Sequence, residues 1–187
     1  QTKKALPCAS DNQAHPGVEP GLEAGSYYDP PNMTYPFGSY ICVMEINVDT
    51  GTTEIRQVYA LDDCGTRINP MVIEGQVHGG LTEALAIAMG QEIAYDEQGN
   101  VTTGTLMDFF VPTAVETPNY QTDHTVTPSP HHPIGAKGVG ESPNVGGVPA
   151  FSNAVHDAFR AFGLTQSHMP HDHWRIWKTA NSLGLHD

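Results

Sequence analysis

Residues 40–90 decide the fold, because they indicate two strands and a long helix in succession: YICVMEINVDTGTTEIRQVYALDDCGTRINPMVIEGQVHGGLTEALAIAMG. Apolar residues alternate with others on both sides of a turn at 49–52, which predicts a β-hairpin from Tyr40 to about Leu61. Glu45 interrupts the strict alternation of the first strand. The chain then leaves the sheet at residues 62–68.

A helix follows at once. Asn69 is a typical N-cap, and proline, here Pro70, is favoured at the first helical position. Apolar residues recur every three or four positions, which predicts a helix to about Met89 with Gly90 as its end. The recurring residues are Ile73, Val77, Leu81, Leu85 and Ala88. Three glycines interrupt them: Gly75, Gly79 and Gly80. Because each costs about 1 kcal/mol relative to alanine, we expect close packing against a strand or a ligand there.

The rest of the chain completes an α+β pattern of β-hairpins packed with two main helices. Residues 1–36 contain six prolines and predict an extended loop or tail, which leaves 37–187 as the structured part. The remaining expected elements are a hairpin at 92–105 with its turn at 96–100, a strand at 121–127, a helix at 149–162 and a helix at 171–182.

The composition of the chain limits the classes of function that it can have. The 187 residues carry a net charge of −13, which argues against nucleic acid and anionic membranes as partners. No apolar run is long enough for a transmembrane helix. Cys8, Cys42 and Cys64 have neither metal-binding nor disulfide-framework spacing, so we expect a cytoplasmic protein. Between residues 57 and 159 only Arg67 and Lys137 are cationic, and both adjoin turn-like segments where an anion would bind.

The segment at 134–143, IGAKGVGESP, is the best candidate for a ligand-binding loop. Its glycines allow a backbone to approach a ligand closely, and successive N–H groups make a concave anion site. Glu141 would then be an acid or base beside that ligand, unless it is an ordinary solvated glutamate. The spacing matches neither a Walker loop nor a dinucleotide fingerprint.

Weaker candidates have plain structural explanations beside the chemical one. Gln76 offers an amide to a heterocycle edge, or is an exposed helix glutamine. Cys64 is a thiolate, or a small residue in a tight loop. The adjacent Asp62 and Asp63 point to opposite faces of a strand and cannot easily share a proton, so a turn or backbone-bonding role is favoured. The histidine pairs, at 131–132 and at 171 and 173, lack zinc spacing.

Three segments together carry a family resemblance: DDCGTRINP at 62–70, EGQVHGG at 74–80 and KGVGE at 137–141. They resemble the C-terminal part of the molybdenum-binding large subunits of the xanthine oxidase family. Residues 96–100, 127–133 and 169–172 look most like the members that oxidise carbon monoxide. The similarity runs from about Glu19 to Asp187, so residues 37–187 are expected to be the C-terminal part of a molybdopterin-binding domain.

The resemblance implies a molybdenum ion held by molybdopterin cytosine dinucleotide. Glu141 would be the base beside the molybdenum, and Gln76 would bond the pterin. The residues wrapping the pterin and its phosphates would be Cys64, Gly65, Thr66, Arg67, Lys137, Gly138, Val139 and Gly140. Copper would be held by a cysteine outside this chain.

The partners implied are the rest of the large subunit, an iron–sulfur small subunit and an FAD-binding medium subunit. In that family the large subunit is several times longer, so this chain alone should not turn over substrate. Two alternatives stay open: a related hydroxylase of aldehydes or N-heterocycles, and a non-catalytic folding or assembly module.

Overall fold

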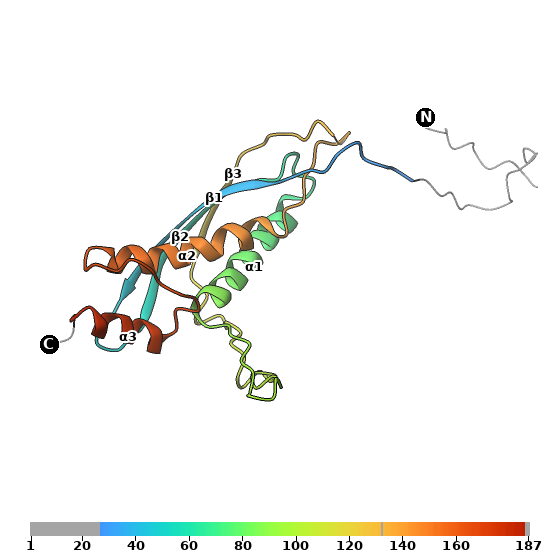
Figure 1. Cartoon of the computed structure of the whole chain (residues 1–187). Helices are drawn as coiled ribbons and strands as arrows, with labels where there is room; N and C mark the ends of the chain where they lie inside the picture. Colours follow the sequence, from blue (N-terminus) through green and yellow to red (C-terminus); the bar gives the residue numbers. More distant parts are fainter. Residues whose placement is uncertain (1–26, 132, 186–187) are drawn as a thin grey trace, which may run out of the picture. The chain divides into compact units, whose positions relative to one another are not determined.

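The computed structural model describes residues 27–131 and 133–185. Their regular elements mix strands and helices, as the predicted α+β class requires (Figure 1). In chain order they are β1 (Phe37–Ile46), β2 (Thr53–Asp63), α1 (Pro70–Met89), β3 (Tyr120–His124), α2 (Ser142–Arg160) and α3 (His173–Ser182). Contacts divide the chain after Pro31, and all these elements belong to the unit Asn32–Asp187. Of the predicted 1–36 tail, residues 1–26 lie outside the described part.

The predicted first hairpin is confirmed. β1 and β2 pair in antiparallel fashion, and Gly51 makes the turn with a positive φ of 72°. The pairing register shifts between Val43 and Met44, next to the glutamate that interrupts the alternation. Such a bulge bends a strand and increases its twist.

Helix α1 has the predicted bounds. The Asn69 side chain accepts a hydrogen bond from the backbone N–H of Val72, and Gly90 ends the helix. Of the three glycines, only Gly80 is closely packed: a Cβ placed on it would lie 2.5 Å from Cγ of Pro143 in α2. A Cβ on Gly75 or Gly79 meets no described atom within 4 Å, so the expectation of close packing fails for these two.

The predicted second hairpin is wrong. Within residues 92–105 only one isolated antiparallel bridge forms, between Tyr95 and Val101, around a turn stabilised by Asp96. Both bridging side chains are more than half exposed. A two-stranded hairpin without a buried face is marginal in water, which explains why regular strands do not form.

The later strand and helices differ from prediction at their ends. β3 ends at His124 rather than at residue 127, and it runs parallel to β2. α2 begins at Ser142, seven residues before the predicted start, and Pro149 lies inside it. α3 begins at His173, after Asp172 as its N-cap.

Helix α2 starts early because tertiary contacts favour it. A Cβ on Gly147 would lie 2.7 Å from Cβ of Ala84 in α1, and the Tyr40 ring fills the space beside Gly146. These glycines let α2 approach both α1 and β1, and that packing outweighs their low helix propensity. Pro143 occupies the first turn, where proline is tolerated.

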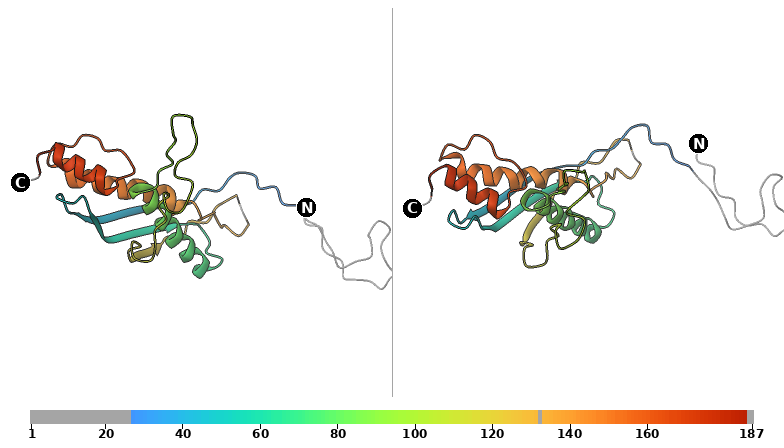
Figure 2. Two further views of the ribbon diagram at one scale, coloured as in Figure 1. Left: turned by 90° about the horizontal axis from the view of Figure 1, so that it is seen from below. Right: turned by 60° about the horizontal axis from the view of Figure 1, so that its bottom comes forward.

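The core lies between the sheet and the two long helices, which share one face of the sheet (Figure 2). Val58 and Ala60 of β2 pack there against Leu81 of α1 and Phe151 of α2. A second cluster joins the C-terminal half of α2 to α3. In the part of the chain that the structure describes, no helix is long and apolar enough to cross a membrane.

Candidate functional site

Two segments predicted to bind the cofactor lie side by side, although about seventy residues separate them. Gly65 and Ala136 form an antiparallel bridge. The Thr66 N–H donates to the Gly135 carbonyl at 3.2 Å, and the Lys137 N–H donates to the Cys64 carbonyl at 2.8 Å. The segment after β2 and the glycine loop before α2 therefore form one continuous backbone surface.

This bridge needs glycine at two places. Gly65 has a φ of 67° and Gly135 a φ of 76°, the left-handed region that favours glycine. A Cβ on Gly65 would collide with the Gly135 carbonyl, and one on Gly135 would lie 2.8 Å from Cβ of Pro128. A side chain at either position would separate the two segments.

The buried side chain of Asp63 stabilises the bridge between the two segments. Its carboxylate is buried and accepts hydrogen bonds from the N–H of Gly65 at 2.9 Å, the N–H of Thr127 at 3.1 Å and the hydroxyl of Thr125 at 2.8 Å. The Lys137 ammonium completes the set at 3.0 Å. Burial alone raises the pKa of Asp63, but these donors outweigh it and hold the pKa well below its usual value.

Lys137 is turned inward. Its side chain is 7% exposed, and the ammonium lies 4.5 Å from the centre of the Phe37 ring as well as beside Asp63. The charge that was expected to attract an anion is therefore neutralised within the chain. A contact between Lys137 and the cofactor remains a prediction, since Asp63 engages its ammonium and the Cys64 carbonyl engages its backbone N–H.

The glycine loop itself is open. The backbone N–H groups of Gly138, Val139 and Gly140 donate to no backbone carbonyl of the described residues. Gln76 of α1 reaches this loop: its Oε1 lies 3.2 Å from where a Cβ on Gly140 would stand. The structure thus brings Gln76 together with the predicted loop, which spacing along the sequence does not reveal.

Glu141 lies at the end of the loop, at the N-cap of α2. Its side chain is exposed and makes no capping hydrogen bond. The glycine loop therefore does not enclose this carboxylate within the described residues, although partial enclosure is what would adapt it to proton transfer. Any enclosure must come from outside the described residues.

Cys64 is buried, with 3% of its surface exposed. Burial raises the pKa of its thiol, which opposes a thiolate at neutral pH. This agrees with the plainer interpretation, a small residue in a tight loop. Among residues 27–131 and 133–185, no group of three or more histidine, cysteine or acidic side chains is placed to hold a metal ion.

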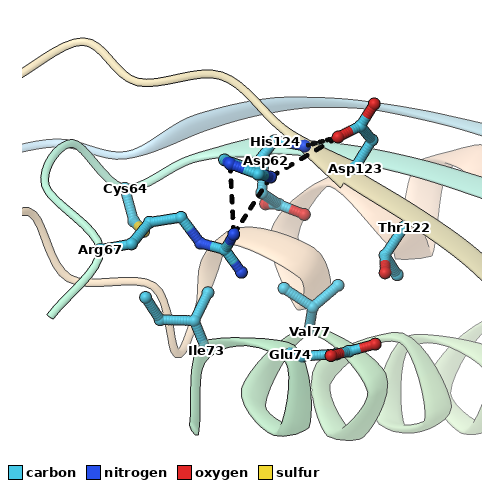
Figure 3. A pocket seen from close by; sticks show the side chains of 9 residues that line it. All are labelled: Asp62, Cys64, Arg67, Ile73, Glu74, Val77, Thr122, Asp123 and His124. Carbon is cyan, nitrogen blue, oxygen red and sulfur yellow. Dashed lines mark hydrogen bonds and ion pairs between the residues drawn. The ribbon is translucent and has the colours of Figure 1, made fainter. Parts of the chain in front are cut away.

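A polar pocket of about 200 Å³ opens beside the bridge, between the ends of β2 and β3 and the first turns of α1 (Figure 3). Arg67 reaches across it, with its guanidinium 3.1 Å from Nδ1 of His124. Two buried atoms facing this region have no hydrogen-bond partner among the described residues, Nε of Arg67 and Oδ2 of Asp62. A ligand group that both accepts and donates hydrogen bonds would satisfy them.

The aspartate pair is buried, and the two carboxylates bond to different sets of partners, which agrees with the prediction that they do not share a proton. The predicted backbone-bonding role is confirmed for Asp63, which accepts the N–H groups of Gly65 and Thr127. Sequence reasoning missed the partners of Asp62. Asp62 bonds the hydroxyls of Tyr40 and Ser142. Neither partner can be predicted from the neighbouring sequence, because one hydroxyl lies 22 residues before the carboxylate and the other 80 residues after it.

The chain is similar to the carbon monoxide dehydrogenase large chain of Afipia carboxidovorans, with 69% identity over 100% of this chain and 23% of that protein. A crystal structure of Cu,Mo-CO dehydrogenase in its carbon monoxide reduced state matches with 70% identity and a TM-score of 0.86, over 94% of this chain and 22% of that one. Quinoline 2-oxidoreductase from Pseudomonas putida 86 matches with 36% identity and a TM-score of 0.81, over 91% and 22% of the two chains.

The chain therefore spans about a quarter of the length of the relatives it matches. The family model for the molybdopterin cofactor-binding domain matches residues 5–118, which is more than half of the chain. The chain belongs to the molybdopterin cofactor-binding domain family.

Proposed function

We propose that this chain holds part of a molybdenum–molybdopterin cytosine dinucleotide cofactor and places Glu141 beside the metal. The observation that carries this proposal is the joining of the two predicted segments by the Gly65–Ala136 bridge, with Gln76 at their edge. The residues present fit such a group. The open N–H groups at 138–140 suit phosphate oxygens, and a half-buried guanidinium with an unpaired Nε suits a polar heterocycle or phosphate.

Glu141 is the proposed active-site base. When bound, the cofactor supplies a metal centre that accepts two electrons from the substrate. The carboxylate of Glu141 takes up a proton released as water is consumed, and Gln76 orients the pterin through its amide. Glu141 is exposed in this chain, whereas a base works best when it is partly desolvated. The proposed role therefore requires the remainder of the large subunit to cover Glu141.

The proposed reaction of the intact enzyme is the oxidation of carbon monoxide with water to carbon dioxide, two protons and two electrons. The 69% identity to a carbon monoxide dehydrogenase large chain supports this substrate. Copper would be held by a residue outside this chain. Electrons would leave through an iron–sulfur subunit and an FAD-binding subunit, and we place the assembly in the cytoplasm. This chain alone is expected to be inactive.

Replacement of Glu141 in the intact enzyme tests the proposal. Glu141→Gln keeps the size and removes the base, so we expect turnover of carbon monoxide to fall at least about a hundredfold while molybdenum and cytosine nucleotide contents stay unchanged. Glu97→Gln, at an exposed turn residue, is the matched control and should keep full activity. Full activity in the Glu141 variant would overturn the assigned role.

A hydroxylase of N-heterocycles is the second candidate, and the match to quinoline 2-oxidoreductase favours it. The two candidates predict different copper contents for the intact large subunit. Metal analysis of the intact large subunit should find copper with molybdenum if carbon monoxide is the substrate, and molybdenum alone if a heterocycle is.

A non-catalytic assembly module is the third candidate, which the exposed position of Glu141 favours. Analysis of the intact large subunit for molybdenum and cytosine nucleotide separates this from the other two. A folded subunit without either component would support the assembly role.

A further inference from the structure

Two consecutive aspartates at the end of β2 hold the two ends of the loop that carries Glu141. Asp63 pairs with Lys137, the residue before the open stretch 138–141. Asp62 accepts a hydrogen bond from the Ser142 hydroxyl at 2.8 Å, directly after that stretch. Neighbouring side chains on a strand point to opposite faces. The two aspartates can therefore reach different ends of the loop although they are adjacent in sequence.

The attachment at Asp62 is buried and shared by two hydroxyl groups. Only 4% of Asp62 is exposed. Its Oδ1 accepts hydrogen bonds from both Tyr40 and Ser142, whose hydroxyls also lie 3.0 Å apart. The Tyr40 ring in turn packs against Gly146 of α2. Three side chains from β1, β2 and α2 therefore fix the first residue of the helix.

Among the described residues, none holds the side chain of Glu141 in a comparable way. Its side chain makes no capping hydrogen bond, and its backbone carbonyl accepts the Val145 N–H within the first turn of α2. Its direction is thus set by where α2 begins. The residue that fixes this start is its immediate neighbour, Ser142.

We propose that Asp62 is a positioning residue for Glu141 and acts through the hydroxyl of Ser142. This inference rests on the proposed role of Glu141 as the base beside the metal. A carboxylate in this place suits the task, because it accepts two hydroxyl bonds at one oxygen and is held by the sheet rather than by the loop. Small displacements of a catalytic group cost large factors in rate.

Removal of the Ser142 hydroxyl from the intact enzyme is the sharpest test. For Ser142→Ala we expect kcat for carbon monoxide to fall about tenfold with an unchanged KM, together with a shifted acid limb in the pH profile of kcat. Ser142→Thr keeps the hydroxyl and should recover most of the rate. Asp62→Ala removes the shared acceptor oxygen and should lower kcat in the same way.

Ser152→Ala is the matched control, because it removes a hydroxyl from the same helix that bonds Nε2 of His171 at 2.8 Å, away from the loop. It should leave kcat and its pH profile unchanged. A Ser142→Ala enzyme that matches this control in kcat and pH profile would overturn the inference. If Glu141→Gln also keeps full activity, the proposed function fails; if that variant is inactive, only the positioning role fails.

Discussion

At the scale of single residues, the ion pair between Lys137 and Asp63 links the glycine loop to the end of β2. Both side chains are almost fully buried. Lys137→Met would leave a buried carboxylate without its cation, so we expect the free energy of unfolding of the chain to fall by about 3 kcal/mol. Lys178→Met, at an exposed position on α3, is the control and should change it by less than about 0.5 kcal/mol. Chemical denaturation measures both, and equal losses would contradict the assigned importance of the pair.

We expect His171 to make the stability of the chain depend on pH. Burial lowers the pKa of His171, and the nearby Arg175 lowers it further, whereas Asp172 raises it. The unfolded chain therefore binds a proton that the folded chain does not, so stability should fall as pH drops below the ordinary histidine pKa of about 6.5.

His171→Gln removes this titration and keeps a neutral polar side chain. The variant should lose less stability than the parent chain between pH 8 and pH 5.5, measured by denaturant unfolding at each pH. Identical losses in the two proteins would show that another group is responsible.

Glu141 and Gln76 could be named as candidate site residues from their residue type and their neighbours in the sequence. The sequence did not predict that Lys137 turns inward, because the acceptor, Asp63, lies 74 positions earlier and is hidden by the fold. Side-chain partners set by tertiary contact are the part of the site that local patterns cannot reveal.

At the scale of elements, α1 offers a direct test of the packing between the two long helices. Gly80→Ala would place a Cβ 2.5 Å from Cγ of Pro143, so it should lower the melting temperature. Gly79→Ala, one residue earlier in the same helix, meets no described atom within 4 Å and should stabilise the chain by up to about 1 kcal/mol. Thermal unfolding of both variants is the measurement, and a stabilising effect at both positions would contradict the observed contact.

Local sequence was enough to predict an element whose ends are marked by capping or turn residues. α1 has the predicted bounds because Asn69 and Gly90 mark its ends, and the hairpin around Gly51 formed as expected. The hairpin at 92–105 failed because its apolar residues find no buried face. The start of α2 was misplaced because two prolines both suit a first turn, and contacts with Tyr40 and α1 decided between them.

At the scale of the whole molecule, the face of the sheet opposite the helices is apolar and uncovered within the described chain. Ile41, Val43, Tyr59 and Leu61 are between 40% and 61% exposed there. We expect the isolated chain to self-associate through this face, since large exposed apolar patches promote association. Ile41→Thr with Leu61→Thr should lower the apparent mass in analytical ultracentrifugation, and a parent chain that sediments as a monomer would contradict the expectation.

We expect residues 137–142, which Asp63 and Asp62 hold at their two ends, to direct Glu141 toward molybdenum. The most direct measurement is a crystal structure of the intact, cofactor-loaded enzyme, with molybdenum located by its anomalous scattering. We predict that the Glu141 carboxylate lies beside the metal and that Gln76 contacts the pterin. A carboxylate directed into bulk solvent, away from the metal, would contradict it.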